Sequence, residues 1–168
     1  ADAVHHFHTR GIIHRDLKPA NVVVRPSGEP VVLDLGLAVA PDQDQRITKT
    51  GAMLGTPHYM APEQVEGKDI SPSCDLYAVG AMLYRMIAGH PPYEGTSSLS
   101  ILQKHMHEDL PDLCAECPEV DPRVGAAVQA LMAKSPEDRP ADAEAAKALF
   151  EGLPCERLKV EKRRPRRR

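Results

Sequence analysis

The chain has 168 residues, which is enough for one domain of ordinary size and leaves little room for a second. Apolar residues make up 42% and charged residues 27%, a balance that allows a buried core and argues against wholesale disorder. Trp is absent, Phe occurs twice and Tyr four times, so we expect a core of aliphatic side chains, Met and Ala. No apolar run approaches the ~20 residues of a membrane-spanning helix.

The net charge of −3 hides a strong asymmetry along the chain. Residues 1–155 carry 13 Lys and Arg against 22 Asp and Glu, whereas residues 156–168 carry 8 against 2. The acidic body is therefore not expected to bind nucleic acid. The basic residues 153–168 are predicted to form a disordered tail or linker. A nucleic-acid arm and a segment lying against an anionic membrane stay open as alternatives.

Four cysteines without a signal peptide predict a reducing, cytoplasmic setting. Cys114 and Cys117 have half of the spacing of a zinc site. No second C-x-x-C or H-x-x-x-H follows at the right distance, so a zinc site is not expected. The thiols are interpreted as structural bystanders.

The chain opens with Ala1, and residues 1–8 are predicted to form the end of a helix that stops at Gly11. We therefore expect the sequence to start inside a domain. No carboxylate at ligand spacing accompanies the histidines of this helix, which predicts an exposed helix face. The histidines of this helix are His5, His6 and His8. Two later histidines, His105 and His107, are also predicted at the surface.

A short β-hairpin is predicted from two β-branched runs at residues 22–24 and 31–33, separated by a Pro- and Gly-containing turn. Directly before the first strand stands His14-Arg-Asp-Leu-Lys-Pro-Ala-Asn21. Directly after the second stands Asp34-Leu-Gly. Polar groups at the ends of a rigid hairpin are candidates for function, because loops on a scaffold usually carry it.

These two segments resemble the catalytic loop and the metal-binding motif of protein kinases. Three later segments resemble the same family in the same order. They are Gly-Thr-Pro-His-Tyr-Met-Ala-Pro-Glu at 55–63, Asp-Leu-Tyr-Ala-Val-Gly at 75–80 and Pro-Glu-Asp-Arg-Pro at 136–140. Five motifs in family order over residues 1–150 are very hard to produce by chance. The loop and the 55–63 segment are more similar to Ser/Thr than to Tyr kinases.

The resemblance implies ATP and Mg²⁺ as cofactors and Ser/Thr hydroxyls of proteins as substrates. Asp16 would orient the attacking hydroxyl and accept its proton, and Lys18 would lie near the transferred γ-phosphoryl group. Asn21 and Asp34 would hold Mg²⁺, for which oxygen ligands are suited.

The resemblance also implies a switch in the activation segment. Arg15 would bind a phosphothreonine, and Thr48 and Thr50 resemble the autophosphorylation sites of bacterial Ser/Thr kinases. Thr56 would hydrogen-bond to Asp16 and Lys18 and line the substrate groove.

Supporting roles are implied for three further residues. Asp75 would accept hydrogen bonds from the catalytic-loop backbone, and Glu63 would form a buried ion pair with Arg139. Asp75 lies near the start of a helix predicted from Ser71 to Gly89, and further helices are predicted at 98–107, 123–134 and 141–150. Leu99, Leu102 and Met106 are predicted to form a core stripe.

The predicted fold is α+β and mainly helical, with residues 1–152 forming the large, C-terminal lobe of a kinase and the small lobe absent. The sequence has no Gly-rich loop, strand Lys or helix Glu of a small lobe. The chain is therefore expected to be a fragment with negligible activity alone. A non-catalytic, pseudokinase-like binding module stays the alternative. Kinase dimerisation and membrane proximity through the tail are left open.

Overall fold

The structure is a computed structural model, and it describes residues 2–33 and 56–153. Seven α-helices, two strands and three short 3₁₀ helices occur in these residues. The helices are α1 (Asp2–His8), α2 (Pro62–Glu66), α3 (Ser73–Ala88), α4 (Ser98–His107), α5 (Leu113–Glu116), α6 (Pro122–Leu131) and α7 (Ala143–Ala148). The strands are β1 (Val22–Val24) and β2 (Pro30–Val32), and the 3₁₀ helices are η1 (Pro19–Asn21), η2 (Pro57–Tyr59) and η3 (Pro136–Asp138).

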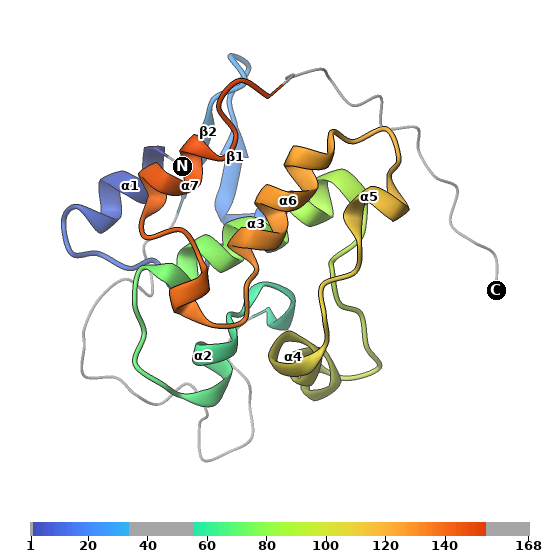
Figure 1. The fold of residues 1–168 in the computed structure, drawn as a ribbon. Coiled ribbons are helices and arrows are strands. Elements are labelled where there is room, and N and C mark those ends of the chain that lie inside the picture. Colours follow the sequence, from blue (N-terminus) through green and yellow to red (C-terminus); the bar gives the residue numbers. More distant parts are fainter. Residues whose placement is uncertain (1, 34–55, 154–168) are drawn as a thin grey trace.

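Helix α3 is the central element. It runs through the middle of the molecule, with the hairpin on one side and α2 and α4 on the other (Figure 1). It contacts α5, α6 and η2, and most of its residues are buried. A Cβ atom on Gly80 would lie 2.7 Å from Cγ of Met132, so only glycine allows α3 and the end of α6 to approach this closely. The prediction of a buried helix in this region is confirmed.

The core is more aromatic than the composition suggested. All four tyrosines are buried, and Tyr77, Tyr84 and Tyr93 are among the largest fully buried side chains. The predicted core of aliphatic side chains, Met and Ala is therefore present, but the prediction left out the tyrosines. A buried tyrosine hydroxyl usually has a polar partner, as that of Tyr93 has in the carbonyl oxygen of Glu108, at 2.9 Å.

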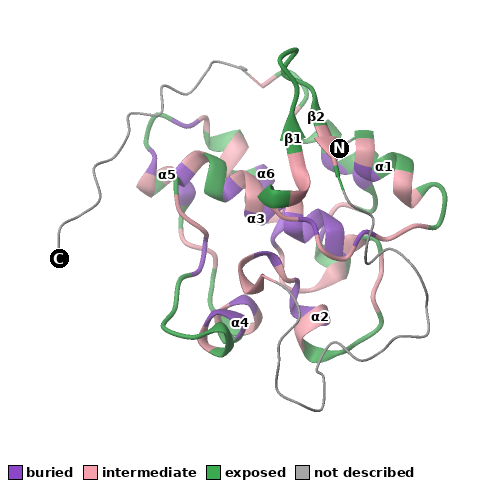
Figure 2. Ribbon diagram, turned by 180° about the vertical axis from the view of Figure 1, so that it is seen from behind, coloured by how far each residue is buried: buried purple, intermediate pink, exposed green. Residues whose placement is uncertain are grey.

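The predicted hairpin is confirmed, with its second strand one residue earlier than expected. Strands β1 and β2 are antiparallel, and Val23 lies opposite Val31. Gly28 closes the turn with φ +88°, a left-handed conformation that glycine adopts readily. Figure 2 shows that the hairpin is exposed toward its tip, whereas buried residues gather along α3. Val24 is 60% exposed although it is apolar.

The helix predictions are confirmed in place and partly wrong in detail. Helix α4 has the predicted bounds, whereas α6 and α7 are shorter than predicted, and α2 and α5 were not predicted. Helix α3 begins at Ser73. Ser71 was predicted to cap it with its side chain, but it is the backbone carbonyl oxygen of Ser71 that accepts the N–H of Cys74. Leu99 does not belong to the core, because the buried face of α4 is formed by Ile101, Leu102 and His105 and leaves Leu99 63% exposed.

His105 was predicted at the surface, and this prediction is wrong. Its side chain is fully buried between α3 and the segment that follows α3. Its Nδ1 lies 2.8 Å from the hydroxyl oxygen of Tyr77, and its ring packs edge-on against Tyr93 with centroids 4.8 Å apart. His107, two residues later, is exposed as predicted. His105 therefore fastens α4 to the central helix.

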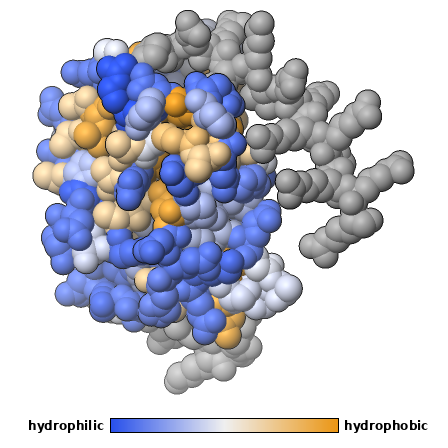
Figure 3. Space-filling view, turned by 45° about the vertical axis from the view of Figure 1, so that its right-hand side comes forward, coloured by the Kyte–Doolittle hydropathy of each residue, from blue (hydrophilic) through white to orange (hydrophobic). Residues whose placement is uncertain are grey.

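The outer surface in Figure 3 is mostly hydrophilic, with a hydrophobic strip in its upper half. Among the described residues, no helix combines the length and the apolar character needed to cross a membrane.

We predict that His105 makes the stability depend on pH. Burial, and next the positive charge of Lys134, lower the pKa of His105 from 6.5 to about 3. The folded protein keeps this ring neutral while the unfolded chain binds a proton below about pH 6.5, so stability is lost as the pH falls toward 4. The free energy of unfolding should fall with a contribution from His105 of at most about 1.4 kcal/mol per pH unit. Urea titrations across this range measure it.

His105→Gln should flatten this pH dependence, whereas the matched His107→Gln, on the exposed side of α4, should leave it unchanged. Equal slopes in the wild type and in His105→Gln would contradict the prediction.

Candidate functional site

The loop 14–21, between α1 and β1, is held by one carboxylate of the central helix. Asp75 is 2% exposed in the first turn of α3. Its Oδ2 accepts the backbone N–H of His14 and its Oδ1 accepts that of Arg15, both at 2.8 Å. Arg15 has φ +65°, a conformation that costs energy for a residue other than glycine. The hydrogen bonds to Asp75 offset this strain and thereby fix the path of the loop, as the resemblance implied.

His8 adds a contact to the same carboxylate. Its Nε2 lies 2.9 Å from Oδ2 of Asp75, and its side chain is nearly buried. The predicted exposed histidine face is therefore confirmed for His5 and His6 and wrong for His8. The partner lies 67 positions away in the sequence, so no local spacing could reveal it.

Gln64 ties the loop to helix α2, a contact that the sequence analysis missed. Its Nε2 donates to the carbonyl oxygen of Arg15 at 2.9 Å, and its Oε1 accepts the N–H of Ala61 at 3.1 Å. Arg15 thus has its backbone N–H held by α3 and its carbonyl held by α2.

The structure brings Asp16, Lys18 and Asn21 together. Lys18 Nζ lies 2.7 Å from Oδ2 of Asp16, and both side chains are partly open to solvent. Asn21 donates from Nδ2 to the carbonyl oxygen of Asp16 at 3.0 Å. No donor from the described residues reaches Oδ1 of Asn21, which leaves an oxygen free to ligate a hard cation.

The residue that follows β2 lies next to the loop that carries Asn21. The N–H of Leu33 donates to the carbonyl oxygen of Asn21 at 2.7 Å, so residue 33 lies directly beside the loop. Asp34 is the next residue and lies outside the described residues, as do Thr48 and Thr50. Thr56 is described, and it forms no hydrogen bond to Asp16 or Lys18 there, whereas the two charged groups pair with each other.

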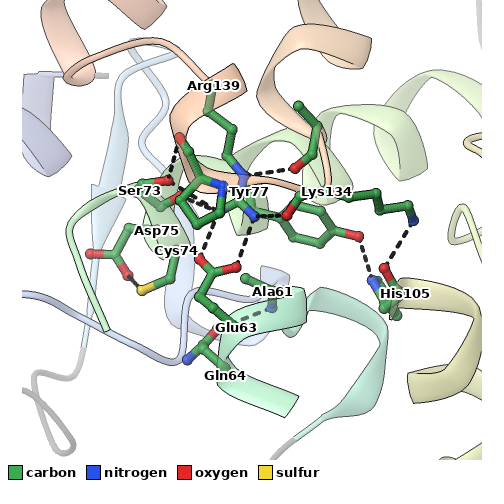
Figure 4. A network of polar contacts seen from close by, with 12 residues as sticks. Ala61, Glu63, Gln64, Ser73, Cys74, Asp75, Tyr77, His105, Lys134 and Arg139 are labelled. Carbon is green, nitrogen blue, oxygen red and sulfur yellow. Dashed lines mark hydrogen bonds and ion pairs between the residues drawn. The ribbon is translucent and has the colours of Figure 1, made fainter. Parts of the chain in front are cut away.

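A buried ion pair joins the start of α2 to the residue that follows η3. Arg139 and Glu63 form the predicted buried ion pair, with NH1–Oε1 and NH2–Oε2 at 2.7 and 2.8 Å (Figure 4). The guanidinium also donates to backbone carbonyls of three residues and stacks over the ring of Tyr77, 4.9 Å from its centroid. These carbonyls belong to Ser73, Ala133 and Lys134.

Burial also sets the ionisation of the groups around this ion pair. Burial raises the pKa of the Cys74 thiol well above its usual value, and the charge of Asp75 raises it further. Burial lowers the pKa of Lys134 to about 8. Cys74 is therefore a neutral hydrogen-bond donor, with Sγ 3.8 Å from Oδ1 of Asp75.

Within residues 2–33 and 56–153, no cluster of three or more His, Cys, Asp or Glu side chains forms a metal site. Cys114 and Cys117 form no disulfide within the described residues, and Sγ of Cys117 donates to the carbonyl oxygen of Ile87 at 3.8 Å. A Mg²⁺ ion held by Asn21 and Asp34 would not appear as such a cluster, because one ligand is an amide and the other lies outside the described residues.

We predict that Arg139→Met lowers the free energy of unfolding by about 3 to 5 kcal/mol, because it leaves Glu63 buried without its partner. Urea denaturation measures the loss. The double variant Glu63→Gln/Arg139→Met should recover part of it, because the stranded charge is then removed. A single variant as stable as the wild type would contradict a buried, fully paired guanidinium.

Comparison with known proteins agrees with this geometry. Residues 1–150 match the protein kinase domain family. The chain is 44% identical over 138 residues to the DNA damage-responsive serine/threonine-protein kinase RqkA of Deinococcus radiodurans, which covers 82% of this chain and 21% of that protein. It is 39% identical over 165 residues to the serine/threonine-protein kinase pkn3 of Myxococcus xanthus, covering 92% and 30%.

A third relative is the serine/threonine-protein kinase PknL of Mycobacterium tuberculosis, 38% identical over 146 residues that cover 87% of this chain and 36% of that protein. The chain thus spans between about a fifth and about a third of the length of these relatives. The match extends over the loop held by Asp75 and over both partners of the Glu63–Arg139 pair. By its sequence over nearly its whole length, this chain belongs to the protein kinase domain family.

Proposed function

We propose that this chain carries the phosphoryl-transfer residues of a Ser/Thr protein kinase, which moves the γ-phosphoryl group of ATP to Ser/Thr hydroxyls of proteins. The observation that carries the proposal is the grouping of Asp16, Lys18 and Asn21 on one loop, within hydrogen-bond distance of one another. Each of the three relatives is itself named a serine/threonine-protein kinase.

In this proposal Asp16 accepts the proton of the attacking hydroxyl and orients it. Its carboxylate is partly open to solvent and reachable by a substrate. Lys18 is close enough to neutralise Asp16 before substrate binds, and its flexible ammonium can turn to the transferred group. Positioning and charge neutralisation are the main contributions that a protein makes to this reaction.

The residues present fit Mg²⁺ together with ATP. The free Oδ1 of Asn21 is an oxygen ligand of the kind that Mg²⁺ prefers, and Asp34 would supply a carboxylate. When bound, the ion would neutralise the charge of the phosphates. The chain's own contribution is to hold Asn21 rigidly, through its Nδ2 on Asp16 and its carbonyl oxygen on Leu33.

We further propose that residues 1–152 are the large lobe of the kinase and that a small lobe and the adenine base pack on the hairpin. The hairpin exposes Val23, Val24 and Leu33 beside Asn21, an apolar surface that water solvates poorly. Residues 1–168 alone are expected to bind ATP very weakly and to turn over negligibly.

The regulatory roles stay proposals as well. Arg15 would bind a phosphate on Thr48 or Thr50 and so order the activation segment, and Thr56 would line the substrate groove. The basic residues 153–168 would form a linker, with membrane proximity, a cytoplasmic location and dimerisation as further expectations. The complete set of Asp16, Lys18 and Asn21 favours catalysis over a pure binding module.

We predict that Asp16→Asn in the full-length protein lowers transfer from γ-labelled Mg-ATP to a Ser/Thr peptide by about 10²- to 10⁴-fold, because the proton acceptor is lost.

Mass spectrometry of the wild-type protein after the same reaction should find phosphate on Thr48 or Thr50.

The matched control is Asp69→Asn, which changes an exposed carboxylate in the segment after α2 and should leave the rate unchanged. Transfer that survives Asp16→Asn, or a wild-type protein that transfers no phosphate with Mg-ATP, would contradict the proposed function.

A further inference from the structure

Arg85 lies in the last turn of α3 and reaches toward the segment that would frame the protein substrate. Its NH1 donates to the hydroxyl oxygen of Tyr59 at 2.8 Å. Tyr59 closes η2, which begins one residue after Thr56. The guanidinium is therefore attached to η2, which directly follows Thr56, the residue that the proposed function places in the substrate groove.

The attachment is rigid. Tyr59 is only 5% exposed, and η2 contacts both α3 and α4. The neighbouring ring of His58 places Nδ1 3.1 Å from the carbonyl oxygen of Tyr93, which fixes η2 on the segment after α3. A long cationic side chain normally loses much freedom when it binds a ligand, and a side chain that is already held loses less.

The positive charge of Arg85 is uncompensated within the described residues. A guanidinium has five N–H donors, and only one contact of Arg85, to Tyr59, is made there. By contrast, Arg25, Arg123 and Arg139 each pair with a carboxylate. The partial negative charge at the C-terminal end of a helix also stabilises a cation. This stabilisation forms no hydrogen bond to the guanidinium, so its remaining N–H groups stay available to a ligand.

We propose that Arg85 is a specificity-determining residue that selects an acidic side chain in the protein substrate. This inference rests on the proposed function. A carboxylate suits the remaining donors, because two parallel N–H groups of a guanidinium bind both of its oxygens. Residues 1–155 carry an excess of acidic groups, so the body of the chain does not attract acidic peptides in general. Selection of such a substrate therefore depends on a local cation.

The test uses the full-length protein and pairs of Ser peptides that differ only by Glu or Gln at one position, with this position moved along the peptide. At one or more positions the Glu peptide should have a kcat/KM about fivefold higher, chiefly through KM, as expected for a partly exposed ion pair. Arg85→Gln should reduce the ratio to about one. Arg85→Lys should retain part of it, because the charge remains.

Two further variants sharpen the result. Arg85→Glu should reverse the preference, so that a Lys peptide is favoured over the Glu peptide. Arg123→Gln removes an exposed arginine on α6 that already pairs with Asp121, and it should keep the wild-type ratio.

The proposal is overturned if no position shows a preference for Glu, or if Arg85→Gln keeps the wild-type ratio. In both cases the proposed function survives, provided that the Gln peptides are phosphorylated with Mg-ATP. If no peptide is phosphorylated by the wild type, the proposed function fails and the role of Arg85 fails with it.

Discussion

The carboxylate of Asp75 is the constraint on which the candidate site depends. Its two oxygens accept the backbone N–H groups of His14 and Arg15, and one of them also contacts Nε2 of His8. A loop of this kind would otherwise sample many conformations, and Arg15 would avoid a left-handed backbone. Because Asp75 belongs to the most deeply buried helix, the rigidity of the core is passed directly to the loop that carries Asp16, Lys18 and Asn21.

The same helix organises the segment that would face a protein substrate. Arg139 joins Glu63 to the backbone of Ser73 at the start of α3, and Gln64 joins α2 to the carbonyl of Arg15. At the other end of α3, Arg85 holds the hydroxyl of Tyr59. Segments far apart in the sequence are thus held by contacts to the single helix α3. Phosphoryl transfer depends mainly on the positioning of the reacting groups, and these contacts fix their positions.

Much of this arrangement follows from the sequence where the signal is local or carried by a motif. The hairpin was predictable from its β-branched runs and its turn, α4 from its spacing, and the Asp75 and Glu63–Arg139 contacts from the family resemblance. The failures concern side chains whose partners are distant. His8 and His105 were predicted at the surface because local spacing offered them no partner, yet Asp75 and Tyr77 provide buried partners that are distant in the sequence. The hydroxyls of Tyr59, Tyr77 and Tyr93 likewise have partners far away in the sequence. Leu99 is exposed because the face that α4 buries is set by tertiary packing.

The most direct measurement is hydrogen exchange at the amides of His14 and Arg15 in the full-length protein and in its Asp75→Asn variant. An asparagine of the same shape has an oxygen at one position and an NH₂ group at the other, so in this orientation a donor would face one of the two N–H groups. The account predicts that exchange at one or both amides accelerates about tenfold, the equivalent of one ordinary hydrogen bond, while amides of α6 keep their wild-type rates. Unchanged exchange at His14 and Arg15 would contradict the claim that Asp75 holds the loop.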